Sequence, residues 1–149
     1  MKLLIPIAIA AVALLVPVSA ASADDGGRPI TVQMTGAAER PLPPAGPGGD
    51  PDGTGTATFR VNPGQGEVCY TLTVANIAPA TAAHIHRAPS TDPGPIVVHL
   101  NAPTNGSSSG CATVSRTLAK EIIQNPGAFY VNVHNTTYPG GAVRGQLGK

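Results

Sequence analysis

The stretch Glu67-Val-Cys-Tyr-Thr-Leu-Thr-Val-Ala75 is the clearest structural signal in the sequence. From Val68 to Val74, apolar residues recur at every second position, which places them on one face of a β-strand. A strand with one apolar and one polar face is typical of an antiparallel sheet that packs against a core on one side. This stretch therefore predicts a β protein.

Segments of the same kind lie on both sides of it, separated by turns in a chain that has 18 Gly and 16 Pro. We expect a short helix at Arg116–Gln124, capped by Ser115, and a polar loop at Asn101–Gly110. Short strands at this spacing predict an antiparallel β-sandwich in which the helix is only a connection. The other expected strands are Ile30–Thr35, Thr54–Val61, Ala82–Arg87, Ile96–Leu100, Cys111–Ser115, Ala128–His134 and Ala142–Leu147.

The N-terminal segment predicts export of the protein. A charged start is followed by an apolar stretch, Leu3–Val18, and by small residues that end at Ala23, the pattern of a secretory signal peptide. The apolar stretch is shorter than a spanning helix and contains Pro6 and Pro17. We expect a signal peptide at 1–23, with Ala20 as the alternative cleavage point. A single secreted or extracytoplasmic domain at 24–149, without a membrane span, would follow it.

Composition excludes some classes of function. Nine basic residues less Lys2 leave eight, against eight acidic residues, so the mature chain is close to neutral. A nucleic-acid partner is not expected, because binding of that kind requires a basic patch. The chain contains no G-x-S-x-G motif, and its carboxylates, including Glu39 and Asp92, fall mainly in expected loops without a predicted close pair. The sequence leans against an enzyme.

The two cysteines, Cys69 and Cys111, are predicted to form a disulfide, because an even count in an exported chain is typical of a bridge. The alternative, a pair of thiolate metal ligands, lacks a C-x-x-C spacing. Both cysteines are expected to point away from the apolar faces of their strands. We therefore expect the bridge to join neighbouring strands near an edge of the sheet, with Cα atoms less than about 7 Å apart.

All four histidines, His84, His86, His99 and His134, fall in expected strands. His84 and His86 share a face because they are two residues apart. A His-x-His pair is a good ligand pair for copper or zinc, although no acidic fourth ligand is evident unless Asp92 supplies it. The metal hypothesis requires ring nitrogens of three histidines to converge within roughly 4 Å, since metal–nitrogen bonds are about 2 Å long. It fails if Arg87 occupies the centre.

The alternative hypothesis is a structural cluster of hydrogen-bonded side chains. In the strand that contains Phe129, Val131 and Val133 on its apolar face, the residues Tyr130, Asn132 and His134 should face the other way. Asparagine is disfavoured in strands, so hydrogen bonds must compensate Asn132. We expect one polar cluster of Asn132, His134, His84 and His86, with Arg144 close by. It would fix the order of the strands if it does not bind a metal.

Several segments together resemble the CHRD (chordin-type) domain family. They are Val68-Cys-Tyr-Thr-Leu-Thr-Val74, Ala83-His-Ile-His-Arg-Ala-Pro89, Pro93-Gly-Pro-Ile-Val-Val-His-Leu100 and Ala128-Phe-Tyr-Val-Asn-Val-His-Asn-Thr-Thr-Tyr-Pro-Gly-Gly-Ala-Val-Arg-Gly-Gln-Leu147. The resemblance covers about residues 30–147, and the short single-domain form is similar to bacterial members. It implies an extracellular β-sandwich, immunoglobulin-like or superoxide-dismutase-like, and it does not imply a defined activity.

The last of these segments contains residues to which we assign structural roles. Gly140 and Gly141 are expected to supply positive-φ positions in a tight turn. Arg144 is expected to hold a carbonyl or carboxylate group, and Gly145 to allow close backbone approach or a bulge. The leading functional hypothesis is a non-catalytic secreted domain that binds an unknown extracellular ligand or has a structural role. The alternative is a copper- or zinc-binding protein.

Overall fold

The computed structural model of the chain describes residues 26–40 and 48–148, so the predicted signal peptide at 1–23 lies outside the described residues. The fold is all-β, as the sequence predicts, with one short α-helix, α1 (Arg116–Gln124), in the described part. No helix in that part is long and apolar enough to cross a membrane. The strands are β1 (Arg28–Thr35), β2 (Thr54–Asn62), β3 (Glu67–Ala75), β4 (Ala80–Arg87), β5 (Ile96–Leu100), β6 (Ser107–Thr113), β7 (Phe129–Asn135) and β8 (Val143–Gln146).

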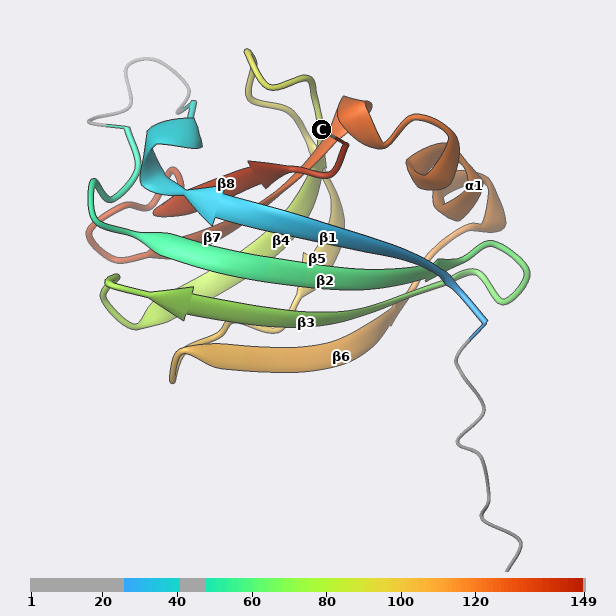
Figure 1. Ribbon diagram of the computed structural model, residues 1–149, viewed down its shortest axis with the longest axis horizontal. Helices are drawn as coiled ribbons and strands as arrows, with labels where there is room; N and C mark the ends of the chain where they lie inside the picture. The colour runs from blue at the N-terminus through green and yellow to red at the C-terminus, as the bar shows by residue number, and fades with distance from the viewer. Residues whose placement is uncertain (1–25, 41–47, 149) are drawn as a thin grey trace, which may run out of the picture.

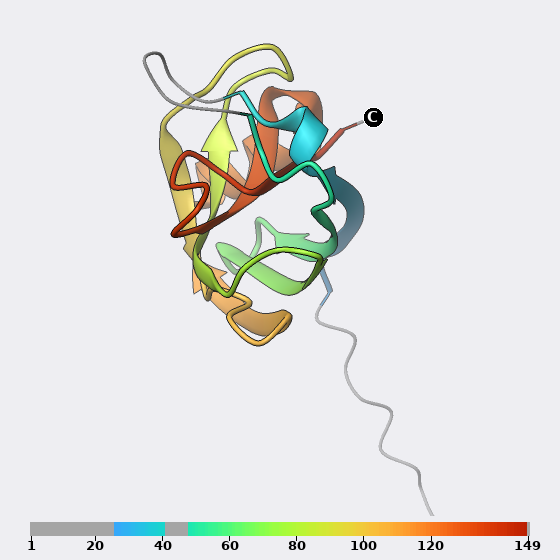
Figure 2. The same ribbon diagram turned by 90° about the vertical axis from the view of Figure 1, so that its left-hand side faces the viewer.

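The strands form one antiparallel sheet in the order β5-β4-β7-β8-β1-β2-β3-β6. Figure 1 views it from the side of β1, β2, β3 and β6, with β4, β5 and β7 behind them. Figure 2 shows that the sheet curves round instead of lying flat, so its two halves form two layers. The junction between the halves is narrow, because β1 and β8 pair only at Thr35 and Arg144.

The core lies between the two layers and follows the alternation of the strands. Val68, Tyr70 and Leu72 of β3 are buried, and so are Phe129, Val131 and Val133 of β7, all within one apolar cluster. The helix α1 adds Ala119 and Ile122 to the same cluster. Ser115 caps α1 as predicted, since its hydroxyl accepts a hydrogen bond from the Leu118 amide at 3.1 Å. The helix thus covers one end of the sheet (Figure 1).

The predicted loop at Asn101–Gly110 is wrong over its second half, because β6 begins at Ser107 and ends at Thr113. Serine and glycine have low β-propensity, which hid the strand. Backbone pairing with β3 holds this strand in place, from the cross-strand pair Thr73 and Ser107 to the pair Glu67 and Thr113. Gly110 also leaves space for the Tyr70 ring, since an added Cβ would lie 2.9 Å from the Tyr70 hydroxyl.

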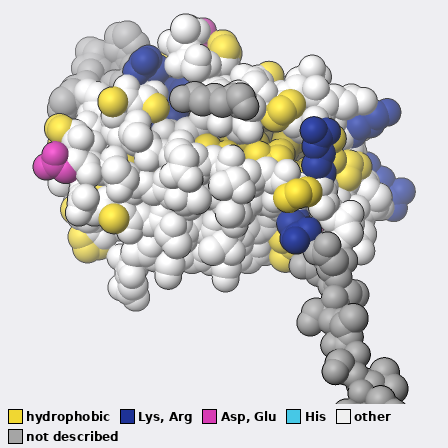
Figure 3. Space-filling view, in the orientation of Figure 1, with side chains coloured by type: hydrophobic (Ala, Val, Ile, Leu, Met, Phe, Trp, Pro, Cys, Tyr) yellow, Lys and Arg dark blue, Asp and Glu magenta, His cyan; other side chains and the backbone are white. Residues whose placement is uncertain are grey.

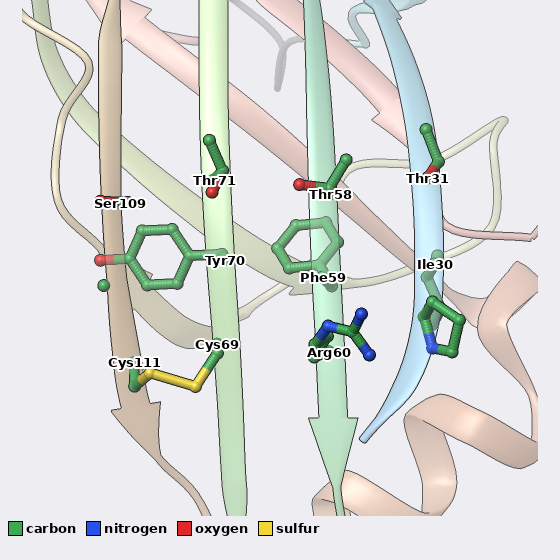
Figure 4. A pocket seen from close by; sticks show the side chains of 12 residues that line it. Ile30, Thr31, Thr58, Phe59, Arg60, Cys69, Tyr70, Thr71, Ser109 and Cys111 are labelled. Carbon is green, nitrogen blue, oxygen red and sulfur yellow. A yellow bond between two sulfur atoms is a disulfide. The ribbon is translucent and has the colours of Figure 1, made fainter. Parts of the chain in front are cut away.

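The disulfide joins Cys69 of β3 to Cys111 of β6, with Cα atoms 3.9 Å apart. The two residues are direct cross-strand partners, and β6 is an edge strand, which confirms the predicted place of the bridge. The disulfide borders a hollow of about 610 Å³ on the outer face of β1, β2, β3 and β6. Figure 4 shows the side chains that line it, among them Thr31, Thr58 and Thr71 on three neighbouring strands. No histidine is visible on this face in Figure 3.

Candidate functional site

The histidines gather on the outer face of the other layer. His84 and His86 lie on β4 and His134 lies on the neighbouring strand β7, where His84 is the direct partner of Asn132. Because Ile85, Val131 and Val133 point into the core, the histidines and Asn132 point out of it. The sheet register therefore brings together residues that are about 50 positions apart in the chain.

Three of the histidines converge on one point. The Nδ1 atom of His84 is 3.1 Å from the Nε2 atom of His134. One ring nitrogen from each of His84, His86 and His134 lies within 4.8 Å of the others. Ligands around one metal at about 2.1 Å are separated by about 3.4 Å in tetrahedral geometry. The His84–His134 pair is close to this spacing, whereas the three nitrogens together lie within 4.8 Å and not within the roughly 4 Å that the metal hypothesis requires, so the rings have to move inward to complete a site.

Backbone carbonyls fix the tautomers of two of these rings. His86 donates its Nδ1–H to the Gly94 carbonyl at 2.8 Å, and His134 donates its Nδ1–H to the Pro139 carbonyl at 3.0 Å. A carbonyl oxygen only accepts, so the proton of each neutral ring stays on Nδ1 and the lone pair stays on Nε2. Metal-ligating histidines in proteins are oriented in this way by an outer acceptor. Each Nε2 lone pair is thus oriented for a ligand, although that of His134 is in contact with His84 Nδ1, which a ligand must displace.

The Nε2 atom of His86 is the most unusual atom of the cluster. His86 is only 7% exposed, and its buried Nε2 makes no hydrogen bond of good geometry in the described structure, although Asn132 lies close enough to raise the pKa of the ring. His134 Nε2 lies 3.1 Å from His84 Nδ1 and 3.0 Å from the end of the Asn132 side chain, which donates its amide N–H when Nε2 carries the lone pair. A buried ring nitrogen with so weak a partner is unusual without a ligand.

The cluster favours neutral imidazoles. Burial lowers the pKa of His84 to about 4, with further lowering by the nearby His134, His86 and His99. Burial also lowers the pKa of His86 and that of His134. Neutral rings are the form in which histidine binds metals. The three rings at neutral pH are therefore ready to act as ligands.

Segment Ala88–Pro95 covers this face and is held by side chains of β7 and β8. Arg144 donates to the carbonyls of Pro89 at 2.8 Å and Asp92 at 3.0 Å, and its guanidinium lies 3.4 Å from the centre of the Tyr130 ring. Tyr130 stacks in turn on His86, with ring centroids 4.7 Å apart. Arg144 holds carbonyls, as expected, and is 1% exposed. The stack of Arg144 on Tyr130 and of Tyr130 on His86 fixes the position of the His86 ring.

Glu39 is a member of the site that sequence reasoning placed in a loop. It follows the 3-10 turn η1 (Gly36–Ala38) and is only 4% exposed. Burial raises its pKa to about 7, against the lowering effect of Arg144 and of a hydrogen bond with Asn132. No pattern in the sequence marks Glu39, because the residue reaches the cluster through tertiary packing against Gly141.

Other predicted members lie near the cluster or outside it. His99 is exposed on β5, and its ring centroid is 5.0 Å from that of His84, but it is not one of the three converging histidines. Asp92 does not supply a fourth ligand in the described structure, since its carboxylate accepts from Thr91. Arg87 pairs with Glu121 at 2.8 Å, so it does not occupy the centre.

The glycines of the closing segment have different roles. Gly141 has φ of 136°, and an added Cβ would collide with the Glu39 carboxylate. The expectation of positive φ is wrong for Gly140, because a positive value at Gly141 alone already turns the chain. At Gly145, a Cβ would collide with the Gln33 carbonyl of β1, which confirms the expected close backbone approach.

A comparison with family models matches residues 30–147 to the CHRD domain. The chain belongs to the CHRD domain family. The match covers the whole sheet from Ile30 onward and includes every histidine, Asn132 and Arg144. Neither the curated proteins nor the solved structures contain a match to this CHRD domain. The function of this domain is therefore inferred from its own geometry.

Replacing Glu39 with glutamine is expected to change how the stability of this CHRD domain depends on pH. The pKa of Glu39 is raised from 4.5 to about 7, so the folded state binds this proton more tightly than the unfolded state. The resulting stability is fully present below pH 4.5 and is lost as pH rises to about 7. Above about pH 7, the free energy of unfolding of Glu39→Gln should exceed that of the parent by up to about 3 kcal/mol.

The measurement is urea unfolding of both proteins from pH 4.5 to pH 8. The pKa shifts of the histidines are shared by the two proteins, so their effects cancel when the two free energies of unfolding are subtracted. Asp52→Asn, at an exposed turn position, controls for the loss of one acidic charge. A constant difference between Glu39→Gln and the parent across this range would contradict the prediction.

Proposed function

We propose that this CHRD domain is a non-catalytic extracytoplasmic protein that binds one copper or zinc ion through His84, His86 and His134. The observation that supports this proposal most strongly is the convergence of one ring nitrogen from each of the three histidines, all within 4.8 Å of one another. Three histidine nitrogens are a donor set that suits both metals. The disulfide and the predicted signal peptide fit an oxidising compartment outside the cytoplasm.

The ligand atoms follow from the hydrogen bonds. His86 and His134 would bind through Nε2, because Nδ1 of each ring donates to a backbone carbonyl. His84 would bind through Nδ1, the atom that faces His134 Nε2. This requires His84 to carry its proton on Nε2, a change of tautomer that releases no proton. The metal would replace the present contact between His84 and His134.

A structural role is the second candidate, and a specific observation favours it. His84 of β4 and His134 of β7 meet directly, with Nδ1 of the first 3.1 Å from Nε2 of the second, beside Asn132, which is only 2% exposed. Such a contact satisfies polar groups between the two strands. In this case the cluster would hold β4 and β7 in register, without any ligand.

Isothermal titration calorimetry with Cu²⁺ and Zn²⁺ separates the two functions. The parent protein is expected to bind one ion, and His134→Gln and His84→Gln are each expected to abolish tight binding. A metal at 100 times its dissociation constant should also raise the free energy of unfolding of the parent by about 2.7 kcal/mol. The two variants should lose this stabilisation.

His99→Gln is the matched control, because it removes an imidazole from the same face without removing one of the three converging nitrogens. It is expected to keep the affinity of the parent. No binding of either metal by the parent, together with lower stability of His134→Gln, would replace the metal function by the structural one. Equal affinity of all the variants would show that the ion binds elsewhere.

A further inference from the structure

A fourth histidine links the proposed site to the solvent. His99 lies on β5, the edge strand next to β4, and is the direct cross-strand partner of His84. Its ring is perpendicular to that of His84, with centroids 5.0 Å apart. The three converging histidines do not include it. His99 is therefore a neighbour of the site and not a member of it.

The rings differ in burial. His99 is exposed, His84 and His134 are half-buried, and His86 is only 7% exposed. His84 is in ring contact with each of the others, at centroid distances of 5.0 Å to His99, 5.0 Å to His134 and 5.5 Å to His86. Any ion that passes from His99 to the inner histidines along these contacts passes His84. The rings form a continuous series of nitrogen donors from the surface inwards.

We propose that His99 is the entry ligand of the metal site, which takes an ion from a soluble carrier and passes it through His84 to the buried position. This inference rests on the proposed metal-binding function. Covered by segment Ala88–Pro95 and backed by the Tyr130 stack, His86 is not accessible to a carrier of any size. An exposed imidazole can displace one carrier ligand while the others still hold the ion.

In each step of the exchange, one metal–ligand bond forms as another breaks. A bond from a His99 nitrogen to the metal forms as one carrier–metal bond breaks, and His84 replaces a second carrier ligand. Bonds from His86 and His134 then form as those to His99 and to the remaining carrier atoms break. The ion keeps its oxidation state, and the carrier leaves with all its donor atoms. Release to a carrier follows the same steps in reverse.

The test is the rate of exchange, measured by stopped-flow mixing of the protein with Zn²⁺ or Cu²⁺ bound to nitrilotriacetate, and of the loaded protein with excess EDTA. For His99→Gln, we expect capture and release both to slow by about tenfold, within the range over which association rates vary among variants of one site. The dissociation constant, measured by calorimetry with the free ion, should stay that of the parent. Ile96→Gln is the matched control on the same strand, since Ile96 is 42% exposed, and it should exchange at the parental rate.

The outcomes separate this inference from the proposed function. If the parent binds metal and His99→Gln exchanges as fast as the parent, His99 is not the entry ligand and the three-histidine site stands. If His99→Gln binds more weakly at equilibrium, as His134→Gln should, His99 belongs to the resting site and the relay is wrong. If the parent binds neither ion, both the site and its entry path are refuted.

Discussion

Arg144→Met is expected to lower the free energy of unfolding by about 3–5 kcal/mol, the usual cost when one partner of a buried charged network is removed. Arg144 is 1% exposed and donates to the carbonyls of Pro89 and Asp92. Its loss leaves the Asp92 carbonyl without its side-chain donor, leaves the Pro89 carbonyl with only the Asp92 amide at 3.3 Å, and removes the cation from the face of Tyr130. It also leaves Glu39 without the positive charge that offsets its burial.

Urea unfolding of the variant and the parent measures this effect. Arg87→Met is the matched control, because Arg87 also lies over an aromatic ring, that of Phe129 at 5.3 Å, but it is exposed and its partner is the Glu121 carboxylate. An exposed pair contributes about 0–1 kcal/mol. Arg144→Lys should stay well below the parent, since an ammonium cannot reproduce the planar stack and the fork of donors. Similar losses for Arg87→Met and Arg144→Met would contradict this account.

Removal of the disulfide is expected to cost about 4 kcal/mol, because the bridge closes a loop of 42 residues in the unfolded chain. Both cysteines lie on the outer face, Cys69 partly buried and Cys111 exposed, so Cys69→Ala with Cys111→Ala should leave little cavity in the core. The measurement is the urea midpoint of the double variant against that of the oxidised parent.

Reduction of the parent with a phosphine provides the control for the substitutions themselves. The reduced parent and the double variant should have the same stability if loss of the link explains the effect. The affinity of the double alanine variant for Cu²⁺ or Zn²⁺ should be that of the parent, because the bridge joins β3 to β6 and the histidines lie on β4 and β7. A loss of stability in the double variant alone would point to the packing of the sulfur atoms instead.

The strands were predictable where period-two alternation is strong. β3 and β5 have the predicted bounds, and the outward faces of His84, His86 and His134 follow from the same rule. β6 was only partly predicted, because Ser107–Gly110 has no alternation and is ordered by its pairing with β3. Side-chain periodicity indicates a face, but it does not detect a strand that depends on its neighbour's backbone.

The candidate site was predictable in its strand residues and not in its loop atoms. The histidines, Asn132 and Arg144 lie in strands, so alternation placed them on one side. Their register is set by tertiary pairing, which makes Asn132 and not His134 the direct partner of His84. The carbonyls of Gly94 and Pro139 belong to turns, and a backbone oxygen leaves no trace in a sequence. Glu39 was missed because its carboxylate reaches the cluster only through tertiary packing against Gly141.

The narrow junction between β1 and β8 makes the site a product of the complete fold. Arg144 joins the two halves of the sheet through its backbone, opposite Thr35, and holds segment Ala88–Pro95 with its side chain. That segment supplies the Gly94 carbonyl that orients His86. Joining of the halves and orientation of the ligand thus depend on the same residue. A chain that captures metal before the halves join would hold it with fewer oriented imidazoles and more weakly, so folding is expected to precede loading.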